Sequence, residues 1–316
     1  MVTPLRIVFF GSPDFAVPTL RALAASAHPV VGVVSQPDRP RGRGQKVTPG
    51  AVAQAAADLG LPLLQPVKLS DPGVRETLAA WHADLGVVAA YGKILPPWLL
   101  AIPPRGLINV HASLLPAWRG AAPVHRAIIA GDRETGVTIM RVVQALDAGA
   151  MLDRVVVPID DDATSVSLEQ ALAVAGAARL VATVDRLAAG PVDEVPQDDA
   201  RATYASKITR ADSPVDWSAP ARATHDRIRG LHPWPHATTT LDGQRLILHR
   251  STVLTQAAAA APGTVVASGP AGVDVAAGDG GVVRLLELQA ENGRRLPAAG
   301  FLAGRPIAPG ARFDAS

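Results

Sequence analysis

The stretch Leu5-Arg-Ile-Val-Phe-Phe10 is a nearly continuous apolar run near the start of the chain. Such a run is typical of a β-strand that is buried on both faces, as in a parallel sheet. It is followed by Gly11-Ser-Pro-Asp-Phe15, which predicts a turn, and then by a helical pattern from about Ala16 to Ala25. A second apolar run, Val30–Ser35, predicts the next strand. A strand, a helix and a strand in this order form the unit from which parallel sheets are built.

The same alternation continues through the first 189 residues. Apolar runs predict further strands, and Ala- and Leu-rich stretches predict helices between them. Two later stretches, 135–143 and 151–158, alternate more openly and predict strands near a sheet edge. The other predicted elements are strands at 61–64, 84–90 and 107–111, and helices at 51–59 and 165–187. We therefore predict an α/β fold with a doubly wound, mostly parallel sheet.

The character of the sequence changes after residue 189. Gly190–Asp199 is polar, acidic and contains proline, which is typical of a linker. Beyond it, a single helix is predicted at 221–231. Short strands separated by Gly-containing turns are predicted at 237–241, 245–251, 263–267, 272–276 and 282–289. That spacing is typical of a small β-barrel, so we predict a first domain at 1–189, a linker at 190–209 and a second domain at 210–316.

The composition limits the class of protein. The chain has 316 residues, of which 48% are hydrophobic and 18% are charged, so it can bury a sizeable core. It contains no cysteine, which excludes thiolate chemistry and leaves any zinc site to histidines and carboxylates. We find neither a signal peptide nor the ~20 apolar residues that a membrane helix needs, and we expect a cytoplasmic protein. The net charge of +2 permits a nucleic-acid partner without requiring one.

The densest group of polar side chains belongs to the predicted strand 107–111 and the loop after it. Strand alternation places Asn109 and His111 on one side, with Val110 opposite. In open α/β sheets, ligands bind beyond the carboxyl ends of the strands, so a site is expected here. An amide and an imidazole can both donate hydrogen bonds to an oxygen that gains negative charge, as acyl transfer requires. Asp147, in a turn that ends at Gly149, is the candidate carboxylate to orient and charge the ring.

No nucleophile accompanies these residues. Ser12 and Ser113 have no obvious partner base, and the nucleophile elbow of the α/β-hydrolases is absent. We therefore expect a group to pass directly between two bound molecules, without a covalent enzyme intermediate.

The segment at 36–49 is locally basic through four side chains: Arg39, Arg41, Arg43 and Lys46. It matches neither the phosphate-binding loop of nucleotide hydrolases nor the glycine fingerprint of dinucleotide-binding folds. Its charge density fits contact with a phosphate backbone. An ordinary solvated loop fits the charge equally well.

These motifs are similar to those of one known family. Asn109-Val-His-Ala-Ser-Leu-Leu-Pro-Ala-Trp-Arg-Gly120, with Leu146-Asp-Ala-Gly149 downstream, resembles the signature of the 10-formyltetrahydrofolate-dependent formyltransferases. Shorter matches extend the resemblance over nearly the whole chain and towards the branch that formylates methionyl-tRNA. They include Phe10-Gly-Ser-Pro-Asp-Phe-Ala16, Gln36-Pro-Asp-Arg-Pro40, Ala90-Tyr-Gly92, Gly136-Val-Thr-Ile-Met140, His232-Pro-Trp-Pro235 and Ala261-Pro-Gly-Thr264.

The resemblance implies a Rossmann-like formyltransferase domain joined to an OB-fold-like β-barrel that helps to hold the initiator tRNA. It implies transfer of the formyl group of 10-formyltetrahydrofolate, a co-substrate, to the α-amino group of methionyl-tRNA, with no metal. It implies that Asn109 and His111 stabilise the oxyanion and that Asp147 pairs with the histidine. It also implies tRNA contacts from the basic segment, and we expect a monomer. The folate contacts that it implies come from Ser113, Leu114, Leu115 and Pro116.

Two alternatives remain open from the sequence. The acceptor could be a small amine, such as glycinamide ribonucleotide or an amino-sugar nucleotide, or the chain could be a tRNA-binding protein without activity. The basic segment and the barrel favour tRNA, and the complete Asn, His and Asp set favours an enzyme. The barrel of the family generally has a basic face, whereas residues 211–316 contain no lysine. Arg222, Arg227 and Arg229 on one predicted helix, or His225 and His232, could supply a local basic patch instead.

Overall fold

The structure, a computed structural model, describes residues 3–41 and 46–314. It consists of two compact units, each made of several segments of the chain. The first unit comprises Met1–Gly120, Glu134–Pro158 and Glu169–Tyr204. The second comprises Ala121–Arg133, Ile159–Leu168 and Ala205–Ser316. Two short segments that precede residue 169 therefore belong to the second unit.

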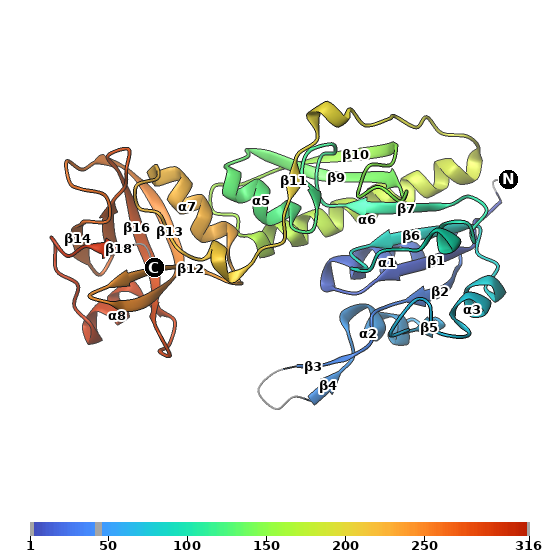
Figure 1. Cartoon of the computed structure of the whole chain (residues 1–316), viewed down its shortest axis with the longest axis horizontal. Helices are drawn as coiled ribbons and strands as arrows, with labels where there is room; N and C mark the ends of the chain where they lie inside the picture. The colour runs from blue at the N-terminus through green and yellow to red at the C-terminus, as the bar shows by residue number, and fades with distance from the viewer. Residues whose placement is uncertain (1–2, 42–45, 315–316) are drawn as a thin grey trace. The chain divides into compact units, whose positions relative to one another are not determined.

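The first unit is built on a seven-stranded sheet with the order β10-β9-β7-β6-β1-β2-β5 (Figure 1). Its strands are β1 (Ile7–Gly11), β2 (Val30–Val34), β5 (Leu63–Leu64), β6 (Leu85–Ala89), β7 (Leu107–His111), β9 (Glu134–Arg141) and β10 (Met151–Pro158). The neighbouring strands β5, β2, β1, β6 and β7 are parallel to one another. Strands β9 and β10 extend the sheet beyond β7 with antiparallel pairing. The prediction of a mostly parallel α/β sheet is confirmed, because long apolar runs such as Ile7–Gly11 are buried at every residue.

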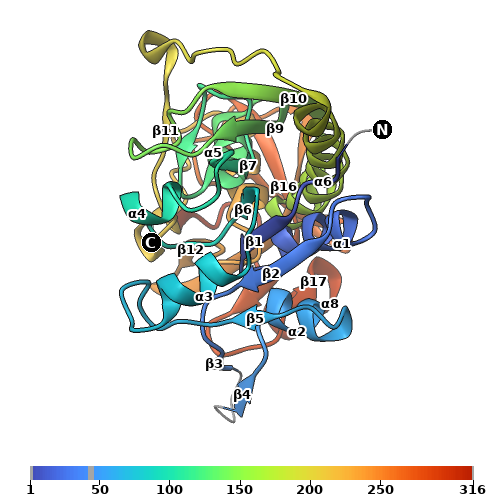
Figure 2. The ribbon, with the colours of Figure 1, turned by 90° about the vertical axis from the view of Figure 1, so that its right-hand side faces the viewer.

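Helices cover both faces of this sheet, with α1 and α6 on one side and α3 on the other (Figure 2). On one face, Phe10 of β1 shares a buried cluster with Leu78 of α3 and Leu99 of α4. On the other, Gly176 allows α6 to approach the sheet closely. The helices are η1 (Asp14–Ala16), α1 (Val17–Ala24), α2 (Ala51–Asp58), α3 (Val74–Ala80), α4 (Pro97–Leu100), α6 (Ser165–Ala189) and η2 (Asp199–Arg201).

Two short pairs of strands lie outside this sheet. Within the segment predicted as a loop at 36–49, β3 (Arg39–Arg41) pairs with β4 (Lys46–Thr48) in an antiparallel ladder. The second pair is β8 (Arg119–Gly120) with β11 (Tyr204–Ala205). Neither pair is predicted from the sequence, since strands of two or three residues leave almost no periodicity.

The second unit is an antiparallel sheet with the order β14-β15-β16-β13-β12-β18, in which β17 also pairs with β16. Its strands are β12 (Ala237–Leu241), β13 (Gln244–Ala257), β14 (Val265–Gly269), β15 (Gly272–Ala276), β16 (Gly281–Ala290), β17 (Leu296–Pro297) and β18 (Phe313–Asp314). A bridge between Thr264 and Arg312 joins the two ends of this path, so the sheet curls into a barrel. The predicted β-barrel is confirmed.

The interior of the barrel is filled by alternate residues of its strands, such as Val273 and Val275 of β15, together with Ile228 and Phe301 from helices. The helices of the unit are α5 (Pro123–Ala130), η3 (Arg210–Asp212), α7 (Ala221–Gly230) and α8 (Ala298–Gly304). Across residues 3–41 and 46–314, no helix has the length and apolar character needed to cross a membrane.

Candidate active site

Strand β7 carries two of the candidate residues at its carboxyl end. Asn109 is half-buried, and His111 is buried with 6% of its surface exposed. Val110, between them, faces α6: a Cβ atom added at Gly176 would lie 3.0 Å from its Cγ1 atom. Because side chains alternate along a strand, Asn109 and His111 face away from α6. The two polar side chains therefore share one face of the sheet.

One hydrogen bond of the His111 ring fixes the roles of its two nitrogens. Its Nε2 lies 3.0 Å from the backbone oxygen of Trp118. Because a carbonyl oxygen can only accept, Nε2 carries a hydrogen and donates it. The proton that the ring gains or loses is therefore the one on Nδ1. In the neutral ring Nδ1 has a free lone pair, and in the imidazolium it is a second donor.

Asp147 lies in the turn between β9 and β10 and faces this nitrogen. Its φ of 48° is in the left-handed region, which is uncommon for a residue other than glycine. Its Oδ2 accepts a hydrogen bond of 2.9 Å from the Gly120 N–H group and lies 3.8 Å from Nδ1 of His111. That distance is too long for a hydrogen bond but short enough for an ion pair with a protonated ring. The structure thus brings His111 and Asp147 together.

Asn109 has no such partner. Its side-chain amide makes no hydrogen bond with any residue in the described part of the chain. It is two residues from His111 on the same face of β7, so both its donor and its acceptor can meet a bound molecule.

A glutamine that the sequence does not single out clamps the Asp147 turn. Nε2 of Gln197 donates to the backbone oxygens of Asp147 and Gly149, both at 2.8 Å. Its Oε1 accepts from Nε and Nη2 of Arg119, at 3.0 and 2.8 Å. Arg119 is buried and directly precedes Gly120, whose N–H group holds the Asp147 carboxylate. One connected set of groups therefore holds both the backbone and the side chain of Asp147.

Gln197 belongs to the segment at 190–209 that the sequence predicts as a linker. The acidic, Pro-containing composition of this segment gives no sign that one side chain bonds 50 residues back in the sequence. The same segment supplies Thr203, whose Oγ1 accepts from the Trp118 N–H group and whose backbone oxygen accepts from the Arg119 N–H group. Long-range hydrogen bonds of this kind leave no periodic signal.

The four residues of the predicted folate loop have two different environments. Ser113 and Leu115 are buried, and the Ser113 hydroxyl donates to the backbone oxygen of Ala117 at 2.5 Å. Leu114 and Pro116 are half-buried. Thr138 of β9 ties the loop to the sheet: its hydroxyl donates to the Ser113 backbone oxygen and accepts from the Leu115 N–H group. Ser113 and Leu115 therefore fix the loop, while Leu114 and Pro116 keep exposed surface.

The predicted tRNA-binding residues are placed only in part. Arg39, in β3, is exposed, and its Nη2 donates to Gln36 at 3.2 Å. The backbones of Arg41 and Lys46 pair with each other in the β3–β4 ladder. Arg43 lies outside the described residues.

Helix α7 does not form the expected basic patch. Arg229 is buried, and its Nε lies 2.7 Å from a carboxylate oxygen of Asp226. Arg222 pairs with the same aspartate at 2.9 Å, and Arg227 donates to two backbone oxygens. His225 is buried as well. The prediction is wrong for this helix because its charged side chains make internal ion pairs and hydrogen bonds.

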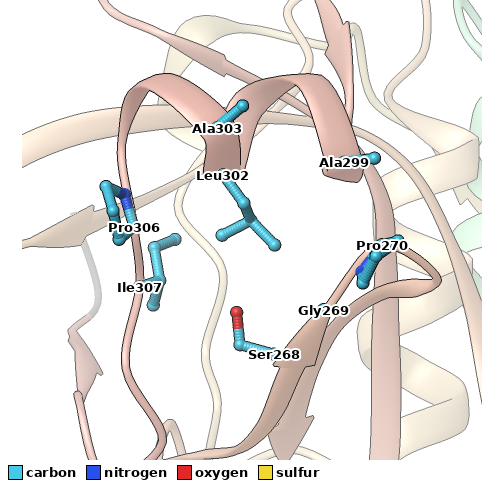
Figure 3. A pocket seen from close by; sticks show the side chains of 8 residues that line it. All are labelled: Ser268, Gly269, Pro270, Ala299, Leu302, Ala303, Pro306 and Ile307. Carbon is cyan, nitrogen blue, oxygen red and sulfur yellow. The ribbon is translucent and has the colours of Figure 1, made fainter.

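Two cavities lie away from these residues. One, of about 350 Å³ in the second unit, is shown in Figure 3, with Leu302 and Ser268 pointing into it. Its lining has no charged group: Ser268, Gly269, Pro270, Ala299, Leu302, Ala303, Pro306 and Ile307. The other, of about 500 Å³ in the first unit, includes the ion pair between Arg141 and Glu194. Neither cavity is lined by Asn109, His111 or Asp147, so the site is assigned from its polar side chains.

Comparisons with known proteins agree with this assignment of the fold. The Formyl transferase family matches residues 5–184, and the family of the Formyl transferase C-terminal domain matches residues 207–306. Among solved structures, the N-formyltransferase of Helicobacter canadensis, in complex with folinic acid and dTDP-3-aminofucose, has a TM-score of 0.69. The superposition covers 89% of this chain and 98% of that protein at 15% identity, which shows a shared fold.

Sequence relatives identify the branch of the family. The methionyl-tRNA formyltransferase of Methylococcus capsulatus is 48% identical over 304 residues, covering 96% of this chain and 98% of that protein. The methionyl-tRNA formyltransferase of Thiobacillus denitrificans is 47% identical over 312 residues, covering 98% of this chain and 100% of that protein. The resemblance seen in the sequence is therefore confirmed, and the chain belongs to the methionyl-tRNA formyltransferase family.

Proposed function

We propose that the formyl transfer typical of this family takes place at the carboxyl end of β7, with Asn109, His111 and Asp147 around the reacting carbon. The reaction moves the formyl group of 10-formyltetrahydrofolate to the α-amino group of methionyl-tRNA. The observation that carries the assignment is the 3.8 Å distance between Nδ1 of His111 and the carboxylate of Asp147, beside an amide without a partner among the described residues.

The nucleophile is the methionyl amine. A free α-amino group has a pKa of ~7.7–8.0, and the ester bond to tRNA lowers it, so unprotonated amine is present near neutral pH. The nitrogen lone pair attacks the formyl carbon, and the carbonyl electrons move onto oxygen. The carbonyl then re-forms, the bond to the folate nitrogen breaks, and a proton from the amine replaces it on that nitrogen. No bond to the protein is formed at any step.

Asn109 and His111 stabilise the oxyanion. Nε2–H of His111 is held by the Trp118 backbone oxygen, so Nδ1–H is the ring donor that remains for the substrate. The Asp147 carboxylate stabilises the imidazolium through its charge. Because it lies 3.8 Å away, it does not compete for the Nδ1 proton as a hydrogen-bond acceptor. In this proposal the carboxylate that charges the ring is therefore distinct from the oxyanion that accepts its hydrogen bond.

The folate co-substrate is proposed to lie along the loop after β7. Leu114 and Pro116 keep exposed apolar surface there, whereas Ser113 and Leu115 are buried and support the loop. Folinic acid, a formylated folate, is bound to the Helicobacter canadensis enzyme of the same fold, which supports a folate in this chain.

Gln197 is proposed as a positioning residue for Asp147. Gln197→Met keeps the length of the side chain but removes both hydrogen bonds to the Asp147 turn. A displaced carboxylate should lower kcat roughly 10- to 100-fold, with little change in KM for folate or tRNA, because misplacement of a reacting group by about 1 Å has this effect. Steady-state kinetics with both substrates measure the split. A purely structural role would instead lower the melting temperature and leave kcat per folded molecule unchanged.

The basic segment is proposed to contact the tRNA. Replacing Arg39, Arg41, Arg43 and Lys46 together with alanine should raise KM for methionyl-tRNA far more than KM for folate. Each lost phosphate contact should also make the dependence of binding on salt concentration less steep. Filter binding over a series of salt concentrations tests this. An unchanged salt dependence of binding would show that the segment makes no phosphate contact with the tRNA.

The acceptor is tested directly. Labelled 10-formyltetrahydrofolate is incubated with methionyl-tRNA, glycinamide ribonucleotide or an amino-sugar nucleotide, and the labelled product is separated. We expect label on methionyl-tRNA alone. Label on a small amine would identify that amine, rather than methionyl-tRNA, as the acceptor. No transfer to any acceptor would favour a tRNA-binding protein without activity.

Three further expectations stay proposals that rest on the sequence. They are that the chain acts as a monomer, that it works in the cytoplasm, and that residues 190–209 link domains at 1–189 and 210–316.

A further inference from the structure

Three histidines of the second unit converge at one place outside the site described above. His232 follows α7, His236 directly precedes β12, and His249 lies in β13. One ring nitrogen from each lies within 4.8 Å of the others. The ring centroids of His236 and His249 are 4.5 Å apart, and those of His232 and His236 are 5.3 Å apart.

The fold of the barrel brings these rings together. In the β12–β13 ladder Ala237 pairs with Leu248, which places the preceding His236 beside His249. His249 is the extra residue of a bulge, because the β13–β16 register shifts between Leu248 and Arg250. A bulge re-aims one side chain and is often found next to a functional site. His236 has a φ of 66°, a conformation that costs energy outside glycine and asparagine.

The hydrogen bonds of His249 determine which of its nitrogens is free. Nε2 of Gln289 donates to the backbone oxygen of Gly293 at 3.1 Å, so the amide oxygen of Gln289 faces the histidine. That oxygen lies 2.8 Å from Nε2 of His249, which must therefore be the donor. Nδ1 of His249 is left as a bare lone pair. Metal-binding histidines commonly donate their other N–H group to an oxygen in this way.

The Nδ1 atoms of the other two histidines lack partners too. The Nδ1 atoms of His232, His236 and His249 are all buried and make no hydrogen bond within the described part of the chain. Burial lowers the pKa of His236 to about 4, with smaller contributions from the other two rings and Arg295. Neutral imidazoles with unused lone pairs are the form in which histidine binds metal ions.

The charges around the cluster have both signs. Burial is the largest cause that lowers the pKa of each of the three histidines, and the positive charge of Arg295 lowers it further, which disfavours an added cation. Glu287 opposes it: it pairs with Arg295 and, at 3.5 Å, with Arg250. An incoming divalent ion would therefore meet a site with a carboxylate nearby whose charge is shared by two arginines.

We propose that His232, His236 and His249 bind one divalent transition-metal ion of the zinc class. Three histidines and an open fourth position form a known type of zinc site. Tetrahedral ligands at 2.0–2.1 Å from zinc are roughly 3.4 Å apart, so nitrogens that lie within 4.8 Å of one another need to approach by at most about 1.4 Å. His232 and His236 are only half-buried and lie outside the strands, so they can make this movement. The site is separate from the proposed formyl transfer and does not depend on it.

The proposal is tested on the full chain without an affinity tag, after removal of metals with a chelator. Equilibrium dialysis against Zn²⁺ followed by elemental analysis should give one ion per chain. Co²⁺ should give the visible absorption bands of tetrahedral coordination by nitrogen ligands. Bound Zn²⁺ should also raise the melting temperature as its concentration increases.

Two variants and a matched control decide the result. His232→Asn changes a half-buried ligand and should abolish the tetrahedral Co²⁺ spectrum, while Gln289→Met should weaken Zn²⁺ binding roughly 10- to 100-fold. His125→Gln, a half-buried histidine of α5 in the same unit, should leave binding unchanged. Less than one tightly bound ion per chain would overturn the proposal. Binding that persists unchanged in both His232→Asn and Gln289→Met would assign the metal to surface groups and overturn it as well.

Discussion

Replacing His111 with alanine should lower kcat for formyl transfer roughly 100- to 1000-fold, because the oxyanion loses one of its two side-chain donors. A loss of that size corresponds to about 2.7–4 kcal/mol of transition-state stabilisation. KM for folate and for tRNA should change little, since the missing hydrogen bond forms fully only in the transition state. Single-turnover measurements with labelled formyl donor would isolate the chemical step from product release.

The double variant His111→Ala/Asp147→Ala sharpens this prediction. If Asp147 acts only by stabilising the protonated ring of His111, removing both side chains should cost no more than removing the histidine alone. The Asp147→Ala variant by itself should then show a smaller loss than His111→Ala. Additive losses would show that Asp147 acts on the substrate directly and would contradict the assigned role.

A second His–Asp pair in the same unit offers a matched control. His28 is buried, its Nδ1 accepts from the Leu5 N–H group, and its Nε2 lies 3.0 Å from Asp185. His28→Gln should therefore lower thermal stability without lowering kcat per folded molecule. Equal losses of kcat in His28→Gln and His111→Ala would mean that the effect is on folding rather than on chemistry.

The strands of the first unit could be predicted because each carries its own signal. Leu107–His111 is apolar except at Asn109 and His111, and alternation alone places these two on one face. The packing of Val110 against α6 has the same cause. Strand ends are harder to predict: β13 runs from Gln244 to Ala257, several residues beyond the predicted end at 251. Residues 252–257 are mostly exposed, and their apolar and polar side chains do not alternate, so they carry no strand pattern.

The rest of the site could not be predicted because it depends on contacts between distant segments. The pairing of His111 with Asp147, at 3.8 Å, could be proposed from chemistry, but the clamp by Gln197 could not. The three-histidine cluster likewise needs the β12–β13 register and the bulge at His249. For helix α7, the sequence shows three arginines but not that Asp226, on the same helix, is buried between two of them.

That buried aspartate gives the largest stability prediction for the second unit. Asp226 is 1% exposed and pairs with Nε of Arg229 at 2.7 Å and with Nε of Arg222 at 2.9 Å. Asp226→Ala leaves the buried guanidinium of Arg229 without its counter-ion, which should destabilise the fold by about 3–5 kcal/mol. Urea unfolding followed by fluorescence should show a much lower urea midpoint for the transition that includes the barrel. Calorimetry should show a lower melting temperature for the same transition.

The matched control is Asp161→Ala, which removes the other partner of Arg222. Asp161 is largely exposed, so water screens its interaction and the midpoint should hardly move. The double variant Asp226→Ala/Arg229→Met should recover much of the lost stability, because it removes the uncompensated charge rather than restoring a bond. If Asp226→Ala shifted the unfolding midpoint no more than Asp161→Ala, the arginines of α7 would have to become exposed to solvent at little energetic cost. That result would restore the basic patch that the sequence predicts on this helix.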